Sequence, residues 1–254
     1  WLKMSYPSDL IDSEWLILKE VLPNRVERGF KRKYSERVLL NAIFYINKTG
    51  CQYRYLPSDY PPWQSVHRYF TKLTNEGVFE KINDFLRERV REKAGRKKTP
   101  SLVCIDYKSV KGDVNLEAKG IDGNKKVKGR KRHIVVDVLG LLLFCAITAA
   151  NVSDVHPGKD FISDLRSLPR LEKVLVDKGY QGMNGNYDNF NVEVSSKKPE
   201  QVGFIPIHKR WVVERTFAWL SRQRRLAKEY EFKIDHQGSM IYTAMSRIML
   251  RRLT

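Results

Sequence analysis

Three acidic residues stand at positions where they could share metal ions. Asp106 and Asp177 each follow a short apolar run, and Glu214 lies within residues 207–229, a stretch without Gly or Pro that we expect to form one long helix. Taken singly, each Asp would usually cap a turn, and Glu214 could be a solvated side chain paired with Arg210. The three residues predict a common site only if the fold brings them together.

Three carboxylates in one place would have a definite chemistry. Without cations they would repel one another and one would take up a proton, whereas divalent ions between them keep all three ionised. Oxygen ligands with open positions select Mg²⁺, and Mn²⁺ could substitute. Two such ions about 4 Å apart activate an attacking water or hydroxyl and stabilise the leaving oxygen of an in-line displacement at phosphorus. The predicted reaction is two-metal-ion phosphoryl transfer.

The overall charge indicates what such a site would act on. The chain of 254 residues has 47 Lys and Arg against 29 Asp and Glu, a net charge of +18, with an ordinary apolar content of 42%. The basic residues are spread over nearly the whole sequence, as in globular proteins that contact nucleic acid along a long surface. We expect double-stranded DNA as the partner, although a purely structural nucleic-acid binder would have the same charge.

Other features bound the class of protein. Cys51, Cys104 and Cys145 are odd in number and far apart, which predicts a reducing compartment and neither disulfides nor a zinc site. The longest apolar run, residues 139–152, is too short to span a bilayer, and no signal peptide is recognised. A Gly-rich phosphate loop is also missing from the sequence. We therefore expect a cytoplasmic protein with no membrane contact and no nucleotide cofactor.

The N-terminal part is expected to be helical. Apolar residues recur at helical spacing, with Ser35 as an N-cap and Gly50 as a stop, over residues 8–21, 35–50, 63–77 and 78–92. The third helix carries Gln64, Arg68 and Lys72 on its polar face, so we predict a helix-turn-helix-like reader of the major groove. The alternative is a small helical bundle whose polar face is merely soluble.

A charged stretch closed by Pro100 marks the expected domain boundary, because the pattern changes there from helical to strand period. We predict a helical DNA-binding domain over residues 1–95 and a catalytic domain over residues 96–254.

The second half has the pattern of a mixed α+β or α/β sheet domain. The expected elements, in order, are a strand, a hairpin, a helix, a second short strand and the late helix, at residues 101–105, 132–138 with 141–148, 157–168, 173–176 and 207–229. This order is that of the ribonuclease-H-like fold, in which the first and fourth strands are parallel neighbours. Asp106 and Asp177 would then meet at neighbouring carboxyl ends, with Glu214 reaching them from the late helix.

Two groups of basic residues are candidates for phosphate contacts. The densest run leads into the hairpin and supplies Lys126, Lys128, Arg130, Lys131 and Arg132, although a solvated strand edge would look the same. Arg210, Arg222 and Arg225 flank Glu214 on the expected late helix. Among the aromatic residues, we interpret Trp211, Trp219 and Tyr230 as core side chains rather than platforms for base stacking.

Several motifs resemble a known family over nearly the full length of the chain. The helical part contains LIDSEWLILKEVLP, LLNAIFYINKTGCQYRYLP and PPWQSVHRYF, and the second part contains IDYKSVKG, KKVKGRKRHIVVDVLGLLL, AANVSD, VDKGYQG and RWVVERTFAWLSRQRRL. In this order they resemble the DDE transposases of bacterial insertion sequences, and most closely insertion-sequence family five. The resemblance implies that Asp106, Asp177 and Glu214 are the acidic triad. It also implies binding of terminal inverted repeats, strand cleavage at the element ends and joining of the 3′ hydroxyl to target DNA.

The sequence departs from the related signature of neighbouring families around the glutamate. That signature has Tyr seven residues before the glutamate, Arg four before and Lys seven after, where this chain has Ile207, Arg210 and Ser221. Arg222 or Arg225 could replace the lysine. Tyr107-Lys108 also stands where Ser and Gln would be expected after Asp106.

Two other functions remain open at this stage. A DNA-binding derivative without catalysis, such as a repressor or domesticated form, would retain the fold, and a nuclease that cuts without joining would use the same site. Transposition requires two DNA ends to be held together, so we expect a homodimer or higher oligomer on DNA.

Overall fold

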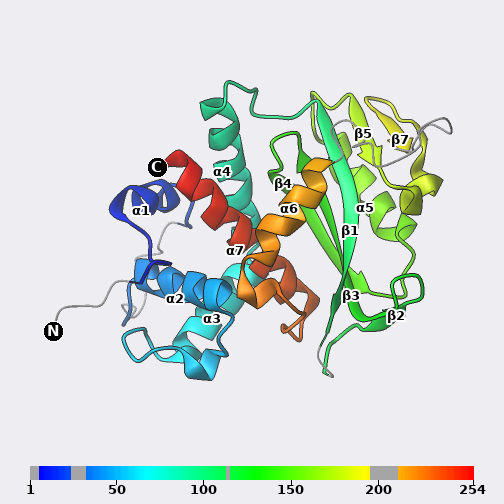
Figure 1. Ribbon diagram of the computed structural model, residues 1–254. Helices are drawn as coiled ribbons and strands as arrows, with labels where there is room; N and C mark the ends of the chain where they lie inside the picture. The colour runs from blue at the N-terminus through cyan, green and yellow to red at the C-terminus, as the bar shows by residue number, and fades with distance from the viewer. Residues whose placement is uncertain (1–5, 24–32, 113–114, 195–210) are drawn as a thin grey trace.

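The computed structural model describes residues 6–23, 33–112, 115–194 and 211–254, which form a group of helices beside a mixed sheet (Figure 1). The α-helices are α1 Asp12–Lys19, α2 Glu36–Thr49, α3 Trp63–Asn75, α4 Val78–Lys93, α5 Val155–Arg166, α6 Trp211–Ser221 and α7 Ile234–Leu253. The strands are β1 Leu102–Lys111, β2 Gly120–Asp122, β3 Val127–Asp137, β4 Leu142–Ala149, β5 Lys173–Val176, β6 Gly185–Asn186 and β7 Asn191–Val194. Short 3₁₀ turns are η1 Tyr53–Tyr55, η2 Lys178–Met183 and η3 Arg224–Leu226. In the described part of the chain, no helix combines the length and apolarity needed to cross a membrane.

The N-terminal helices form where the sequence predicted them. Helix α2 begins with the Ser35 hydroxyl accepting a hydrogen bond from the Val38 N–H, and it ends at Gly50, whose φ of 72° suits a residue without a Cβ. Helices α2 and α3 contact each other, but residues 50–62 with η1 connect them. That connection is longer than the short turn of a helix-turn-helix motif, so the structure supports a helical N-terminal part without establishing the motif.

The sheet is mixed and has the predicted pairing of its central strands. Its order is β2-β3-β1-β5-β7-β6, with β4 also paired to β3. Strand β1 is antiparallel to β3 and parallel to β5, and β4 is antiparallel to β3. The predicted parallel neighbourhood of the first strand and the strand at residues 173–176 is therefore confirmed.

The late helix is shorter than the sequence pattern predicted. We expected one helix over residues 207–229, but α6 ends at Ser221 and a 3₁₀ turn, η3, follows at Arg224–Leu226. The helix ends there because two side chains turn into the interior. Arg225 is buried against Glu231, and Leu226 joins the core. Helix propensity alone did not reveal this tertiary effect.

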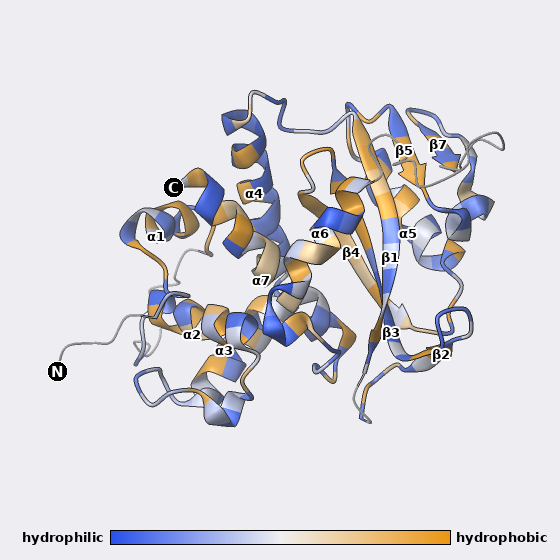
Figure 2. Ribbon diagram, viewed as in Figure 1, coloured by the Kyte–Doolittle hydropathy of each residue, from blue (hydrophilic) through white to orange (hydrophobic). Residues whose placement is uncertain are grey.

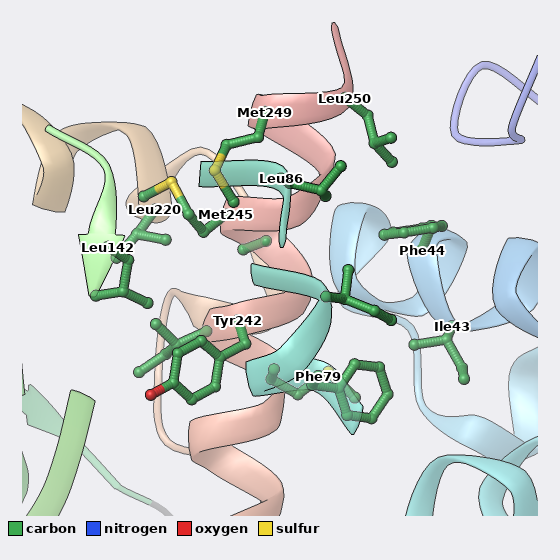
Figure 3. Packing of buried hydrophobic residues seen from close by; sticks show 14 of the residues in the cluster. Ile43, Phe44, Phe79, Leu86, Leu142, Leu220, Tyr242, Met245, Met249 and Leu250 are labelled. Carbon is green, nitrogen blue, oxygen red and sulfur yellow. The ribbon is translucent and has the colours of Figure 1, made fainter. Parts of the chain in front are cut away.

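Helix α7, which the sequence analysis did not single out, lies at the centre of the molecule. Figure 3 shows Tyr242, Met245 and Met249 of α7 among side chains of α2, α4, α6 and β4. One apolar cluster thus joins the N-terminal helices to one face of the sheet, and a second cluster lies between the other face and α5. Figure 2 shows hydrophilic and hydrophobic residues alternating along α1 and α4, as expected for helices with one face on this core.

Candidate active site

Asp106 and Asp177 lie side by side at the end of the parallel strand pair. The last paired residues of β1 and β5 are Ile105 and Val176, and each is followed directly by one of the two aspartates. Asp106 is only 8% exposed and accepts a 2.7 Å hydrogen bond from the N–H of Tyr107. The half-buried Asp177 begins η2 and accepts a 2.7 Å hydrogen bond from the N–H of Lys178.

The first strand does not end at Asp106 as expected. It continues to Lys111 because its other edge stays paired with β3 as far as the Lys111 and Gly129 pair. Asp106 is consequently held in a long strand by its pairing with Ile134 of β3, while the β5 pairing ends one residue before it, at Ile105. The aspartate stands at the carboxyl end of the parallel pairing, although not at the end of its own strand.

Both aspartates belong to the face of the sheet that α6 covers. Cys104 and Leu175 pack in the same cluster as Val213 of α6, whereas the residues that follow them pack in the cluster beneath α5. Because side chains alternate along a strand, the next residues, Asp106 and Asp177, return to the α6 face. Figure 1 shows α6 lying along this face beside β1.

Glu214 lies on an exposed stripe of α6. Ala218 and Ser221, one and two turns further on, are also exposed, while the opposite side of the helix is buried. The helix contacts β1 and β3 and is fastened to the β3–β4 turn by Thr216, whose hydroxyl donates a 2.9 Å hydrogen bond to the carbonyl of Gly140. At the other end of the stripe, the Lys108 ammonium of β1 donates a 3.1 Å hydrogen bond to the Ser221 hydroxyl.

Carboxylates are ligands of a type that suits a hard divalent cation; Asp106 and Asp177 directly follow the last paired residues of adjacent strands, and Glu214 lies on the covering helix. Among the described residues, no three His, Cys, Asp or Glu side chains are gathered closely enough to hold a metal ion. Mg²⁺ is suited to such an open site, because it is commonly bound by one or two carboxylates and completed by water and substrate phosphate. The structure therefore offers carboxylates for ions that substrate and solvent would help to hold.

A neutral hydrogen-bonded network lies behind the Asp177 turn. His133 of β3 lies 2.7 Å from the Tyr180 hydroxyl through Nδ1 and 3.0 Å from the Thr148 hydroxyl through Nε2. Burial, with the nearby charge of Lys131, lowers the pKa of His133 to about 3, so the ring is neutral at physiological pH. The N–H of Tyr180 donates a 2.9 Å hydrogen bond to the carbonyl of Asp177. The network therefore ties the turn that carries Asp177 to the sheet.

Three other aspartates, Asp113, Asp154 and Asp160, are also candidates for a metal site by residue type. Asp154 forms a buried 2.8 Å ion pair with Lys131, and burial raises the pKa of this carboxyl. Asp160 is an exposed residue of α5, and Asp113 lies outside the described residues. None of these three is shown on the α6 face with Asp106 and Asp177.

The basic run before the hairpin divides into buried and exposed members. Arg130 is fully buried and donates to the carbonyls of Ala118 and Glu231 at 2.8 Å, and Arg132 is buried in an ion pair with Glu229. Lys131 is held by Asp154, as described above. These three side chains are at most 7% exposed, so we do not expect them to contact phosphate in this conformation.

The two remaining lysines of the run, Lys126 and Lys128, are exposed at the start of β3, and Lys126 occupies a turn with a φ of 52°. They stay predictions as DNA contacts.

The arginines expected around Glu214 also separate. Arg225 is buried, with a 2.7 Å ion pair to Glu231 and a 3.3 Å hydrogen bond to the carbonyl of Cys51, so it is not available beside Glu214. Arg222 is exposed just beyond the end of α6, and Arg210 lies outside the described residues. Of Arg222 and Arg225, only the exposed Arg222 can bind a phosphate without breaking a buried ion pair.

The polar face of α3 is accessible. Gln64, Arg68 and Lys72 are exposed and line a shallow hollow of about 630 Å³, and Lys72 pairs with Glu76 at 3.6 Å one turn later. This face stays a predicted DNA contact.

The interpretation of the aromatic residues as core was wrong for two of the three. Trp211 is 47% exposed and Tyr230 is 42% exposed, so both lie at the surface. Trp219 is half-buried, with the guanidinium groups of Arg215 and Arg252 at 4.7 Å and 4.6 Å from its ring. The three cysteines are all free.

Comparison with known proteins defines the class. Residues 97–249, more than half of the chain, match the family described as "Transposase DDE domain", and residues 10–83 match the family described as "Putative transposase of IS4/5 family". The chain therefore belongs to the DDE-domain transposase family. A relative from Burkholderia cepacia, "Putative transposase for insertion sequence element IS402", is 36% identical over 124 residues, which cover 44% of this chain. The matched region spans 59% of the length of that relative.

Proposed function

We propose that the protein is a metal-dependent DNA transposase that binds the terminal inverted repeats of an insertion sequence, cleaves DNA strands at its ends and joins the 3′ hydroxyl to target DNA. Asp106, Asp177 and Glu214 are the proposed catalytic and metal-binding residues. The observation that carries the proposal is the placement of Asp106 and Asp177 directly after the last residues of the β1 and β5 pairing, on the face covered by the helix of Glu214.

The strand order supports a ribonuclease-H-like core. When the two short strands are set aside, the order β4-β3-β1-β5-β7 places the third, second, first, fourth and fifth strands side by side. The first three are antiparallel, and the last two run parallel to the first. The part of this order that the sequence predicted is the parallel neighbourhood of the first and fourth strands, whose last paired residues are followed directly by the two aspartates.

The side chains of the site have separable roles in this proposal. Two Mg²⁺ ions, or Mn²⁺ in their place, would be held by Asp106, Asp177 and Glu214, and would activate the attacking oxygen and stabilise the leaving oxygen. Asp106 is fixed by the ladder of β1, and Asp177 is fixed by η2 and the network behind it. Exposed basic residues, Lys126, Lys128 and Arg222 among them, would bind the DNA backbone.

The proposed setting is the bacterial cytoplasm, where the protein would act on double-stranded DNA as a homodimer or higher oligomer because two ends must be joined. The polar face of α3 is the proposed reader of the repeat. A DNA-binding derivative without catalysis is the competing function, and a cleavage assay separates the two.

The first test is cleavage of a labelled duplex that carries the element end, with Mg²⁺, with Mn²⁺ and with chelator. We expect Glu214→Gln, Asp106→Asn and Asp177→Asn each to lower the cleavage rate by at least about a hundred-fold while DNA binding in chelator is retained. Asp160→Asn on α5 is the matched control and should cleave like the parent. A parent protein that binds the end but cuts with neither metal would favour the non-catalytic derivative.

A further inference from the structure

Lys108 is the cation placed nearest to the proposed carboxylates along the strand. It follows Asp106 by two residues in β1, so its side chain emerges on the same face, about 6.6 Å further along. Its ammonium is held on that face by the 3.1 Å hydrogen bond to the Ser221 hydroxyl of α6. The bond joins the strand of Asp106 to the helix of Glu214.

The surroundings of Lys108 favour an added anion. The exposed Lys108 side chain has the cations Arg132 and Lys125 as electrostatic neighbours. Arg132 lies directly opposite Lys108 in the β1–β3 register, but Glu229 already compensates its charge. An ammonium group has three donors and Ser221 accepts from one, so the group can still bind the oxygens of a phosphate.

Ser221 occupies a particular place on α6. It lies two turns after Glu214 on the exposed stripe, at the position where the signature of neighbouring families has a lysine. Arg225 cannot supply that charge because it is buried against Glu231. The structure instead brings an ammonium to the Ser221 position from another element, β1.

On the basis of the function proposed above, we propose that Lys108 binds a backbone phosphate of the DNA strand held at Asp106, Asp177 and Glu214, and that Ser221 positions its ammonium for this contact. The positive charge that the related signature places on α6 is supplied here by Lys108 of β1, the strand that carries Asp106. Lys108 is thus a substrate-binding residue of the site, and Ser221 is a positioning residue.

The test combines a binding measurement in chelator with a cleavage measurement in Mg²⁺, using the element-end duplex and the full chain. One lost phosphate contact lowers the slope of log K against log salt concentration by about 0.9, and we expect this change in Lys108→Met. We expect its cleavage rate to fall by roughly ten- to a hundred-fold, because a charge-assisted hydrogen bond is lost. Lys108→Arg should keep most of both properties.

The decisive variant moves the ammonium from position 108 on β1 to position 221 on α6. The double variant Lys108→Met with Ser221→Lys returns an ammonium to the same place from α6, and we expect it to recover the salt slope and most of the cleavage. The matched control is Lys111→Met, which removes one charge from the opposite face of β1 and should leave the cleavage rate unchanged. Circular dichroism would confirm that each variant is folded.

The outcomes separate this proposal from the function on which it rests. A Lys108→Met variant with the parental slope and rate would overturn the proposal, and so would equal losses in Lys111→Met or a folded double variant without recovery. If the parent itself failed to cut in any metal, the proposed transposase activity would fail, while the salt slope in chelator would still decide whether Lys108 binds phosphate.

Discussion

At the scale of single residues, charge and exposure do not go together in this protein. Arg130 and Arg132 stand in the densest basic run of the sequence, yet both are buried and bind acidic or carbonyl groups inside the fold. Lys108 stands alone between Tyr107 and Ser109, yet its ammonium lies at the proposed site. Local composition predicted nucleic-acid binding for the chain as a whole and could not assign it to these individual side chains.

His133 gives a residue-scale prediction about stability. Its pKa is lowered from 6.5 to about 3 in the folded state, so the unfolded chain binds the proton more readily. Its contribution is therefore intact above about pH 6.5 and is lost as the pH falls toward 3. Between pH 7 and pH 5 we expect the parent to lose about 2 kcal/mol more free energy of unfolding than His133→Gln, in which this site cannot titrate.

Urea denaturation at the two pH values measures this difference. His236, whose pKa burial also lowers, is present in both proteins and cancels in the comparison. Equal pH dependence in the parent and His133→Gln would contradict a buried neutral imidazole at the Tyr180 hydrogen bond.

At the scale of elements, the sequence predicted features that depend on local chemistry better than features that depend on tertiary contacts. The Ser35 cap, the Gly50 stop, the strand at residues 173–176 and the pairing of that strand with β1 all formed as expected, because each depends on local chemistry or a strong apolar pattern. The end of α6 depends on where Arg225 finds an acidic partner, and Glu231 is supplied by a later loop. A residue's place in the helical pattern contained no information about that partner.

The candidate site followed the same rule. Asp106 and Asp177 could be placed together from strand order alone, since parallel neighbours bring their carboxyl ends to one edge. The Lys108 contact could not be predicted, because it needs the angle at which α6 crosses the sheet. Burial of Lys131 against Asp154 likewise depends on the approach of the segment before α5.

The end of α6 leads to an element-scale prediction that separates two adjacent arginines. Arg225→Met removes one partner of a buried ion pair and leaves Glu231 uncompensated, so we expect a loss of about 3–5 kcal/mol in the free energy of unfolding. Arg222→Met alters an exposed side chain and should change that free energy by no more than about 0.5 kcal/mol.

Denaturant unfolding of the two variants at neutral pH gives both values. An Arg225→Met protein as stable as the parent, or one that loses DNA affinity without losing stability, would show that residues 222–229 continue α6 as an exposed basic helix instead of turning inward.

At the scale of the whole molecule, the two expected domains are joined by α7. This C-terminal helix contacts α1, α2, α3, α4 and β4, so the N-terminal helices complete their core with the end of the chain. Asn47 of α2 donates a 2.9 Å hydrogen bond to the carbonyl of Met240, and Asn83 of α4 donates a 2.8 Å bond to the carbonyl of Leu142. Arg91 of α4 also forms a buried ion pair with Asp137 at the end of β3. The division into a helical domain over residues 1–95 and a catalytic domain over residues 96–254 stays a prediction, and one apolar cluster crosses it.

The shared core predicts one cooperative unfolding transition for the full chain. Because α7 packs on both parts, we expect scanning calorimetry to give a single peak whose calorimetric and van't Hoff enthalpies agree, and we expect a fragment of residues 1–95 to lack a cooperative transition.

Met245→Ala, which opens a cavity in α7 between α4 and α6, should cost about 2–5 kcal/mol and move that single peak without splitting it. Two resolved peaks, with only one of them displaced by Met245→Ala, would instead mean that the helical part and the sheet fold as separate units. In that event the α3 face and the carboxylates could move independently when DNA binds. A single peak would mean that the proposed DNA-reading face of α3 and the proposed site are held in place by the common core.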